Sequence, residues 1–185
     1  MTLIAAVVKD GVGYLLTDSY VTHDDGTFST LLEHKAWRLG EMLVGYTGYL
    51  RTGQALRYTL VPPVLEEGTD PRAYLCGPFV NAVRQCLKDT GAAVKPNNDG
   101  SEKLDTSFLI VWQGRIFLLD VDLALAEYTD AYATGSGGLA ATAVMRALPD
   151  LPPRERLERA AHIAAGLMQG VGAPFNILTT LDASP

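Results

Sequence analysis

The sequence has 185 residues, of which 48% are apolar and 19% charged, so it can bury a full core as a single domain over residues 1–185. The formal charge is -6, with acidic and basic residues interspersed, which argues against nucleic acid or an anionic membrane surface as a partner. No apolar run approaches the roughly 20 residues that span a bilayer, and no signal-peptide pattern opens the chain. We therefore expect a cytoplasmic protein.

The cysteine and histidine residues form no metal-binding or disulfide pattern. Cys76 and Cys86 lie in one predicted helical stretch, about 15 Å apart along its axis, which is too far for a disulfide. The segment His23-Asp24-Asp25 is more typical of a solvated loop than of a divalent cation site. Zinc spacings such as CxxC or HExxH are absent from the sequence. We expect neither a metal nor a cofactor.

The first strand is expected directly after Thr2, over residues 3–9. The dipeptide Asp10-Gly11 predicts a two-residue hairpin turn into a second strand that ends at Asp18. Counting back along the ladder from that turn places Leu3 beside Asp18 and Thr2 beside Ser19. The acidic residue Asp18 therefore lies within one position of Thr2.

A second hairpin is expected over residues 35–48, with its turn at Gly40-Glu41. The same counting brings Lys35 opposite Tyr46 and close to Gly48. Both hairpins therefore end in residues that can carry chemistry.

The rest of the chain alternates helices and strands. Helices are expected over residues 49–61, ended by Pro62-Pro63, and over residues 71–90, with a kink at Gly77-Pro78. Residues 91–104 are expected to be a flexible loop. The remaining expected elements are strands over 106–112, 115–121 and 127–134, helices from 138 to 148 and from 153 to about 169, and a last strand over 175–181.

This order of elements favours an α+β fold. Strands, two helices, strands, two helices and a strand can all be buried if two antiparallel sheets pack face to face with helices on both outer sides, as a four-layer αββα sandwich. The alanine-rich helices suit close packing against such a sheet.

Thr2 has a chemical property that few second residues have. If the initiator methionine is removed, as is usual before a residue as small as threonine, one residue carries both a free α-amine and a hydroxyl group. The amine, with a pKa of about 8, can act as the base for the hydroxyl nucleophile. We expect Met1 removal to be the only maturation step, because a strand that begins at Leu3 leaves no room for a propeptide.

The residues Thr2, Asp18, Lys35, Gly48 and Ser136, in this order and spacing, resemble the proteasome β-type subunits, including the HslV-like peptidases, which are N-terminal nucleophile hydrolases. The stretches "LLTDS", "VGYTG" and "FLLDVDLALAEYTDAYATGSGG" carry the resemblance best. It covers nearly the whole chain except residues 91–104.

The resemblance implies a role for each matching residue. Thr2 would be the nucleophile, Lys35 would favour its neutral amine, and Asp18 would hold Lys35. The backbone N–H of Gly48 would stabilise the oxyanion. Ser136, with Ser19 in support, would belong to the hydrogen-bond network. Val21, Tyr46 and Leu50 fall where family members shape the pocket for the residue before the scissile bond, which predicts a roomy, apolar pocket.

One expected residue is missing. Many family members carry an aspartate after the last long helix, whereas Gly166 or Gln169 stands there in this sequence, with no carboxylate nearby. Ser19, Ser136 or water would then have to orient the amine.

Three functions follow from these observations. The first is a threonine endopeptidase in a self-compartmentalising homo-oligomeric ring or spiral, acting on peptides or unfolded proteins delivered by an ATP-dependent unfoldase. The second is a catalytically silent ring or scaffold subunit. The third is an amidohydrolase that acts on a small amide.

Overall fold

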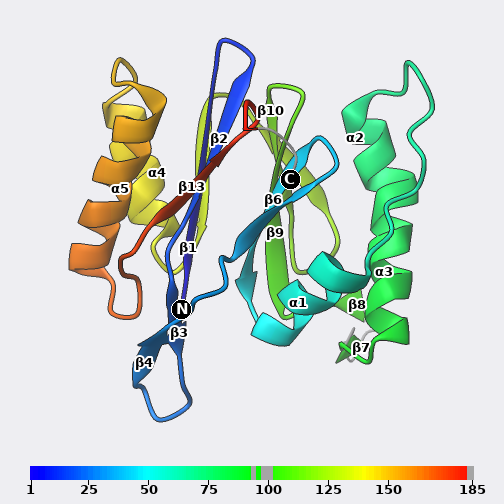
Figure 1. Cartoon of the computed structure of the whole chain (residues 1–185), viewed down its shortest axis with the longest axis horizontal. Helices are drawn as coiled ribbons and strands as arrows, with labels where there is room; N and C mark the ends of the chain where they lie inside the picture. The colour runs from blue at the N-terminus through cyan, green and yellow to red at the C-terminus, as the bar shows by residue number, and fades with distance from the viewer. Residues whose placement is uncertain (93–94, 97–101, 183–185) are drawn as a thin grey trace.

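Two antiparallel β-sheets lie face to face in the centre of the molecule, and helices cover both outer sides (Figure 1), as the computed structural model shows. The structure describes residues 1–92, 95–96 and 102–182. This is the αββα arrangement that the order of elements predicted.

The first sheet has four strands, in the spatial order β12 (Ala131–Gly135), β1 (Leu3–Lys9), β2 (Val12–Thr17) and β13 (Asn176–Thr179). The second sheet has five, in the order β11 (Leu125–Tyr128), β10 (Arg115–Leu119), β9 (Thr106–Trp112), β6 (Met42–Gly48) and β5 (Ala36–Leu39). A separate hairpin, β3 (Tyr20–Thr22) and β4 (Phe28–Thr30), extends from the end of β2.

Helices α4 (Gly138–Ala147) and α5 (Pro153–Leu167) cover the four-stranded sheet. Helices α1 (Leu50–Thr59), α2 (Pro71–Tyr74) and α3 (Val80–Asp89) lie on the side of the five-stranded sheet. Between α2 and α3 the chain forms a π-helical turn, Leu75–Phe79, which contains Pro78. Proline has no N–H to donate within a helix, so the kink predicted there takes the form of this wider turn.

Three apolar cores separate the four layers, and strand alternation explains them. In β1, Leu3 faces helices α4 and α5, where it packs with residues such as Leu157. The next residue, Ile4, faces the other sheet and packs with Leu109 of β9. A third core lies between the five-stranded sheet and helices α1 and α3.

Both predicted hairpin registers are confirmed. Lys9 pairs with Val12, and the ladder continues until the backbone N–H of Asp18 donates to the carbonyl oxygen of Leu3 over 3.1 Å. Leu39 pairs with Met42, and the N–H of Tyr46 donates to the carbonyl oxygen of Lys35 over 3.1 Å. Each turn therefore fixes which residues meet at the opposite end of its hairpin.

Two expectations about the second half of the chain were wrong. The single strand expected over residues 127–134 is two strands in different sheets, β11 and β12. Asp130 lies between them, where its carbonyl oxygen accepts from Val8 and its carboxylate accepts from Arg156. Within the expected loop over 91–104, β7 (Lys95–Pro96) pairs with β8 (Glu102–Lys103), and residues 93–94 and 97–101 lie outside the described residues.

Candidate active site

Thr2 lies at the start of β1 and is 5% exposed. Its backbone N–H donates to the hydroxyl oxygen of Ser136 over 3.1 Å, and that hydroxyl group donates back to the carbonyl oxygen of Thr2 over 3.2 Å. Gly135 makes this close approach feasible, because a Cβ atom there would lie 2.3 Å from the Thr2 carbonyl oxygen. The backbone of Thr2 is thus held from the end of β12.

Lys35 and Asp18 form a buried ion pair beside Thr2. The Lys35 Nζ atom donates to Asp18 Oδ1 over 2.8 Å and to Thr2 Oγ1 over 3.2 Å, and also to the carbonyl oxygen of Tyr20. The Asp18 carboxylate accepts from the backbone N–H groups of Leu3 and Tyr20. Asp18 is fully buried and Lys35 is 3% exposed, so backbone donors fix the carboxylate, and the carboxylate orients the ammonium group.

Burial is the main influence on the charges in this site. Desolvation lowers the pKa of Lys35, while the neighbouring Asp18 opposes that shift. The pKa of the Met1 amine is lowered as well, by desolvation first and then by the positive charge of Lys35. The Met1 amine therefore loses its proton more readily than an amine in water.

Met1 still shapes the site in this structure. The Thr2 hydroxyl group donates to the Met1 carbonyl oxygen over 2.6 Å, and the Met1 amine donates to the Thr22 hydroxyl oxygen over 3.2 Å. While Met1 is attached, the Thr2 nitrogen is an amide and cannot act as a base.

Gly48 ends β6 in a conformation that excludes other residues. Its φ is +117°, and a Cβ atom would lie 2.1 Å from the carbonyl oxygen of Asp105. The next residue, Tyr49, donates its N–H to the hydroxyl oxygen of Thr106, which fixes the chain as it leaves the sheet. Only glycine fits this position.

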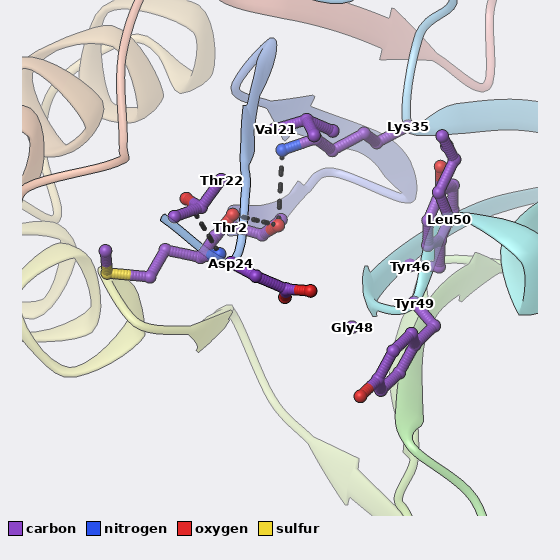
Figure 2. A pocket seen from close by; sticks show the side chains of 10 residues that line it. Thr2, Val21, Thr22, Asp24, Lys35, Tyr46, Gly48, Tyr49 and Leu50 are labelled. Carbon is purple, nitrogen blue, oxygen red and sulfur yellow. Dashed lines mark hydrogen bonds between the residues drawn. The ribbon is translucent and has the colours of Figure 1, made fainter. Parts of the chain in front are cut away.

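A cavity of about 400 Å³ opens next to Thr2 (Figure 2). It is as roomy as the sequence predicted, but it is not purely apolar, because charged and hydroxyl side chains share its walls. Its lining residues are Met1, Thr2, Val21, Thr22, Asp24, Lys35, Tyr46, Gly48, Tyr49 and Leu50.

The structure brings six of the nine predicted site residues to this cavity, and Asp18 and Ser136 contact two of them directly. Ser19 faces elsewhere. Its hydroxyl group donates to the carbonyl oxygen of Pro174 and accepts from the amide of Asn176, which ties the end of β2 to β13. The catalytic roles assigned to these residues stay predictions.

Sequence reasoning missed Thr22, Asp24 and Tyr49 as lining residues. Asp24 was expected in a solvated loop, and it is exposed, but the β3–β4 hairpin places it against the cavity. The signal available was proximity, because this hairpin starts two residues after Asp18.

The segment after α5 reaches the site without a carboxylate. A Cβ atom on Gly170 would lie 2.8 Å from Thr22 Oγ1 and 3.0 Å from Met1 Cε, so this glycine packs against the start of the chain. At Gly166 a Cβ atom would meet nothing within 4 Å. Ser136 is the side chain that accepts a hydrogen bond from the Thr2 nitrogen.

Other site types find little support in the part of the chain described here. No group of three or more potential ligands among His, Cys, Asp and Glu could hold a metal ion within residues 1–92, 95–96 and 102–182. Cys76 and Cys86 are both free thiols. None of the described helices combines the length and the apolar character that a bilayer span requires.

The two packed sheets with helical layers on both outer sides form the fold seen in solved structures of proteasome-type N-terminal nucleophile hydrolases. No protein-family model matches the sequence, and no curated protein matches it either. Solved structures do match, over 96% to 99% of this chain. BPH from Thiobacillus denitrificans is 22% identical, with a TM-score of 0.81 and 99% of each chain covered.

Two further neighbours extend the comparison. HslV from Trypanosoma brucei is 18% identical, with a TM-score of 0.68, 96% of this chain and 98% of that chain covered. Anbu from Hyphomicrobium sp. strain MC1, a Gly-1 mutant, is 15% identical, with a TM-score of 0.69 and coverages of 96% and 80%. At these identities the comparisons show a common fold.

Proposed function

We propose that this protein is a threonine endopeptidase whose N-terminal nucleophile is Thr2, exposed by the removal of Met1. The observation that carries the proposal is the 3.2 Å contact between Lys35 Nζ and Thr2 Oγ1, supported by the buried carboxylate of Asp18. Burying a charged lysine costs desolvation free energy. Here the Lys35 ammonium group is directed at the Thr2 hydroxyl oxygen, on which negative charge would develop.

The proposed reaction uses both groups of Thr2. Its α-amine takes the hydroxyl proton as Oγ1 attacks the carbonyl carbon of the scissile bond. The Gly48 N–H stabilises the oxyanion, a contribution of about 2.7 to 4 kcal/mol in other enzymes. The C–N bond then breaks, the leaving amine takes the proton, and water hydrolyses the ester on Thr2.

Lys35 tunes this reaction in two ways. Its charge favours the neutral form of a nearby amine and stabilises the developing alkoxide; the pKa of the Met1 amine is lowered by desolvation first and by the charge of Lys35 second. Ser136 orients the amine by the hydrogen bond it already accepts from the Thr2 nitrogen.

A homo-oligomer follows from the same proposal. Large apolar side chains are exposed on the helical layers, among them Leu139, Ile163 and Leu167 on α4 and α5. A helical assembly is known for the Anbu complex from Pseudomonas aeruginosa, which shares this fold. We propose a ring or spiral in the cytoplasm with Thr2 facing an enclosed chamber, to which an ATP-dependent unfoldase delivers peptides or unfolded proteins. Light scattering that gives a monomer at micromolar concentration would contradict this arrangement.

A silent scaffold subunit is the second candidate. The observation that favours it is the segment from Met168 to Gly172, which approaches Thr22 and Met1 through Gly170 without supplying a carboxylate.

Pre-steady-state hydrolysis of a fluorogenic peptide separates the two. The peptidase produces a burst equal to the number of Thr2 sites, followed by slower turnover, and intact mass shows a chain that begins at Thr2. The scaffold assembles and releases no product.

A further inference from the structure

Asp24 places a carboxylate on the wall of the cavity that Thr2 also lines. It lies in the loop of the β3–β4 hairpin, its side chain is solvent-exposed, and it lines the cavity. Figure 2 shows the carboxylate pointing into the cavity, toward the side that carries Gly48 and Tyr49. Among the residues that the structure describes, none forms a hydrogen bond or ion pair with it. Asp24 is therefore free to meet a charged ligand.

The other charged groups around the cavity already have partners. The Lys35 ammonium group is paired with Asp18 at 2.8 Å. Glu33, which acts electrostatically on Tyr46 in the cavity wall, accepts hydrogen bonds from Gln54 and Tyr58. The Met1 amine donates to Thr22, and it leaves the site when Met1 is removed. The unpaired charge that a substrate would meet in this cavity is negative.

Apolar walls accompany this charge. Val21 and Leu50 line the same cavity, and Tyr46 adds an aromatic surface. Lysine and arginine side chains suit such a place, because their methylene stems pack on apolar surface while their charged ends reach a polar partner.

We propose that Asp24 selects substrates with a lysine or arginine side chain near the scissile bond. This inference rests on the proposed peptidase function and names its substrate class. A carboxylate on the wall of a cavity attracts a cation during association and holds it in the complex. Norleucine, which has the length of the lysine stem but no charge, should be accepted less well, and glutamate least.

The chain supplies a matched control in the same loop. Asp25 has the same charge one residue away, but it is not among the cavity-lining residues. Its carboxylate accepts hydrogen bonds from the backbone N–H and the hydroxyl group of Thr27, at 2.9 and 2.6 Å. Asp25→Asn therefore removes one negative charge from the hairpin without changing the cavity wall.

The experiment compares three peptides that differ only in carrying lysine, norleucine or glutamate at one of the three positions before the scissile bond. We expect kcat/KM for lysine to exceed that for norleucine by about two- to fivefold, the range that solvent-exposed ion pairs give. Asp24→Asn should abolish that ratio, Asp24→Lys should turn the preference to glutamate, and Asp25→Asn should leave it unchanged. Added salt should reduce the ratio.

The same peptides are then titrated calorimetrically against assembled Thr2→Ala protein, which keeps the cavity and cannot cleave. The selectivity is supported if the lysine peptide has a two- to fivefold lower Kd than the norleucine peptide and this difference disappears when Asp24→Asn is added to Thr2→Ala. This result would support it even if the wild type is catalytically silent. The inference is overturned if Asp24→Asn keeps the wild-type ratio, if Asp25→Asn lowers it equally, or if no peptide binds.

Discussion

The two ends of the sheet sandwich differ in solvent exposure and in the interactions that hold them together. At one end, the turns at Asp10-Gly11 and Gln113-Gly114 use positive φ angles, and Asp10, Gly11 and Gln113 are exposed. A Cβ atom at Gly11 would meet nothing within 4 Å. At the other end, Thr2, Asp18 and Lys35 are at most 5% exposed and hold one another by hydrogen bonds. The turns fix the registers, and the registers decide which residues meet at the buried end.

Local interactions determine the structure of the turns, whereas long-range interactions determine the structure of the buried end. A turn depends on its own few residues, so a substitution there acts on the folding of one hairpin. The buried end depends on three separate segments, so a substitution there should act on activity and stability together, and the following variants test that difference.

Thr2→Ala should have the largest effect on activity. It removes the nucleophile, so peptide hydrolysis should fall to background, whereas assembly should be intact because one hydroxyl group contributes little to the core. Fluorogenic hydrolysis and light scattering measure the two properties. Thr2→Ser keeps a hydroxyl group and serves as the control. If Thr2→Ala still hydrolyses peptides, Thr2 is not the nucleophile.

Lys35→Ala should lower kcat by about 10²- to 10⁴-fold, because it removes the charge that favours the neutral amine and the alkoxide. It should also lower the free energy of unfolding by about 3 to 5 kcal/mol, since Asp18 is left buried without its partner.

The double variant Lys35→Met with Asp18→Asn controls for misfolding. It removes both buried charges, so it should regain stability in urea denaturation while it stays inactive. Recovery of turnover in the double variant would show that Lys35 serves structure alone.

Two glycine substitutions compare the ends directly. Gly48→Ala places a Cβ atom 2.1 Å from the Asp105 carbonyl oxygen, so it should lower the free energy of unfolding by more than about 3 kcal/mol. Gly11→Ala has the same kind of positive φ but open space around it, so its cost should be about 1 kcal/mol. Equal costs in urea denaturation would refute the distinction between a crowded and an open end.

Asp130→Asn should have a small effect, similar in size to that of Gly11→Ala. Its carboxylate, 54% exposed, accepts from Arg156 over 2.8 Å, and this hydrogen bond lowers the pKa of Asp130. Because solvent screens the pair, we expect a cost of about 1 kcal/mol near pH 7.

The pH dependence of that cost follows from the direction of the shift. A lowered pKa in the folded state means that the stabilisation is present above the unfolded value of about 3.9 and is lost as the pH falls through the folded value. Thermal unfolding should therefore separate the wild type from Asp130→Asn at pH 7 and bring them together in acid. A difference in Tm between the two proteins that widens in acid would contradict a stabilising ion pair between Asp130 and Arg156.

The sequence predicted the layers and the registers because hairpin turns and strand alternation are local signals. Lys9 and Val12, once paired across their turn, determine that Asp18 lies beside Leu3. The contact between Lys35 and Thr2 could not be derived in this way, since it joins two sheets, and only the resemblance indicated it. The split at Asp130 was missed because half-buried alternation continues through the crossover between sheets. The position of Asp24 in the cavity wall was missed because sequence periodicity does not predict the direction in which a hairpin loop extends.

Labelling with an epoxyketone tests whether Thr2 is an N-terminal nucleophile. BPH from Thiobacillus denitrificans, which shares this fold, has been solved in complex with epoxomicin. We expect one adduct per chain, mapped by peptide mass spectrometry to Thr2 of a chain that lacks Met1, and no adduct in Thr2→Ala. A Met1-free, assembled protein that stays unlabelled and cleaves no peptide would contradict the peptidase and leave the silent scaffold.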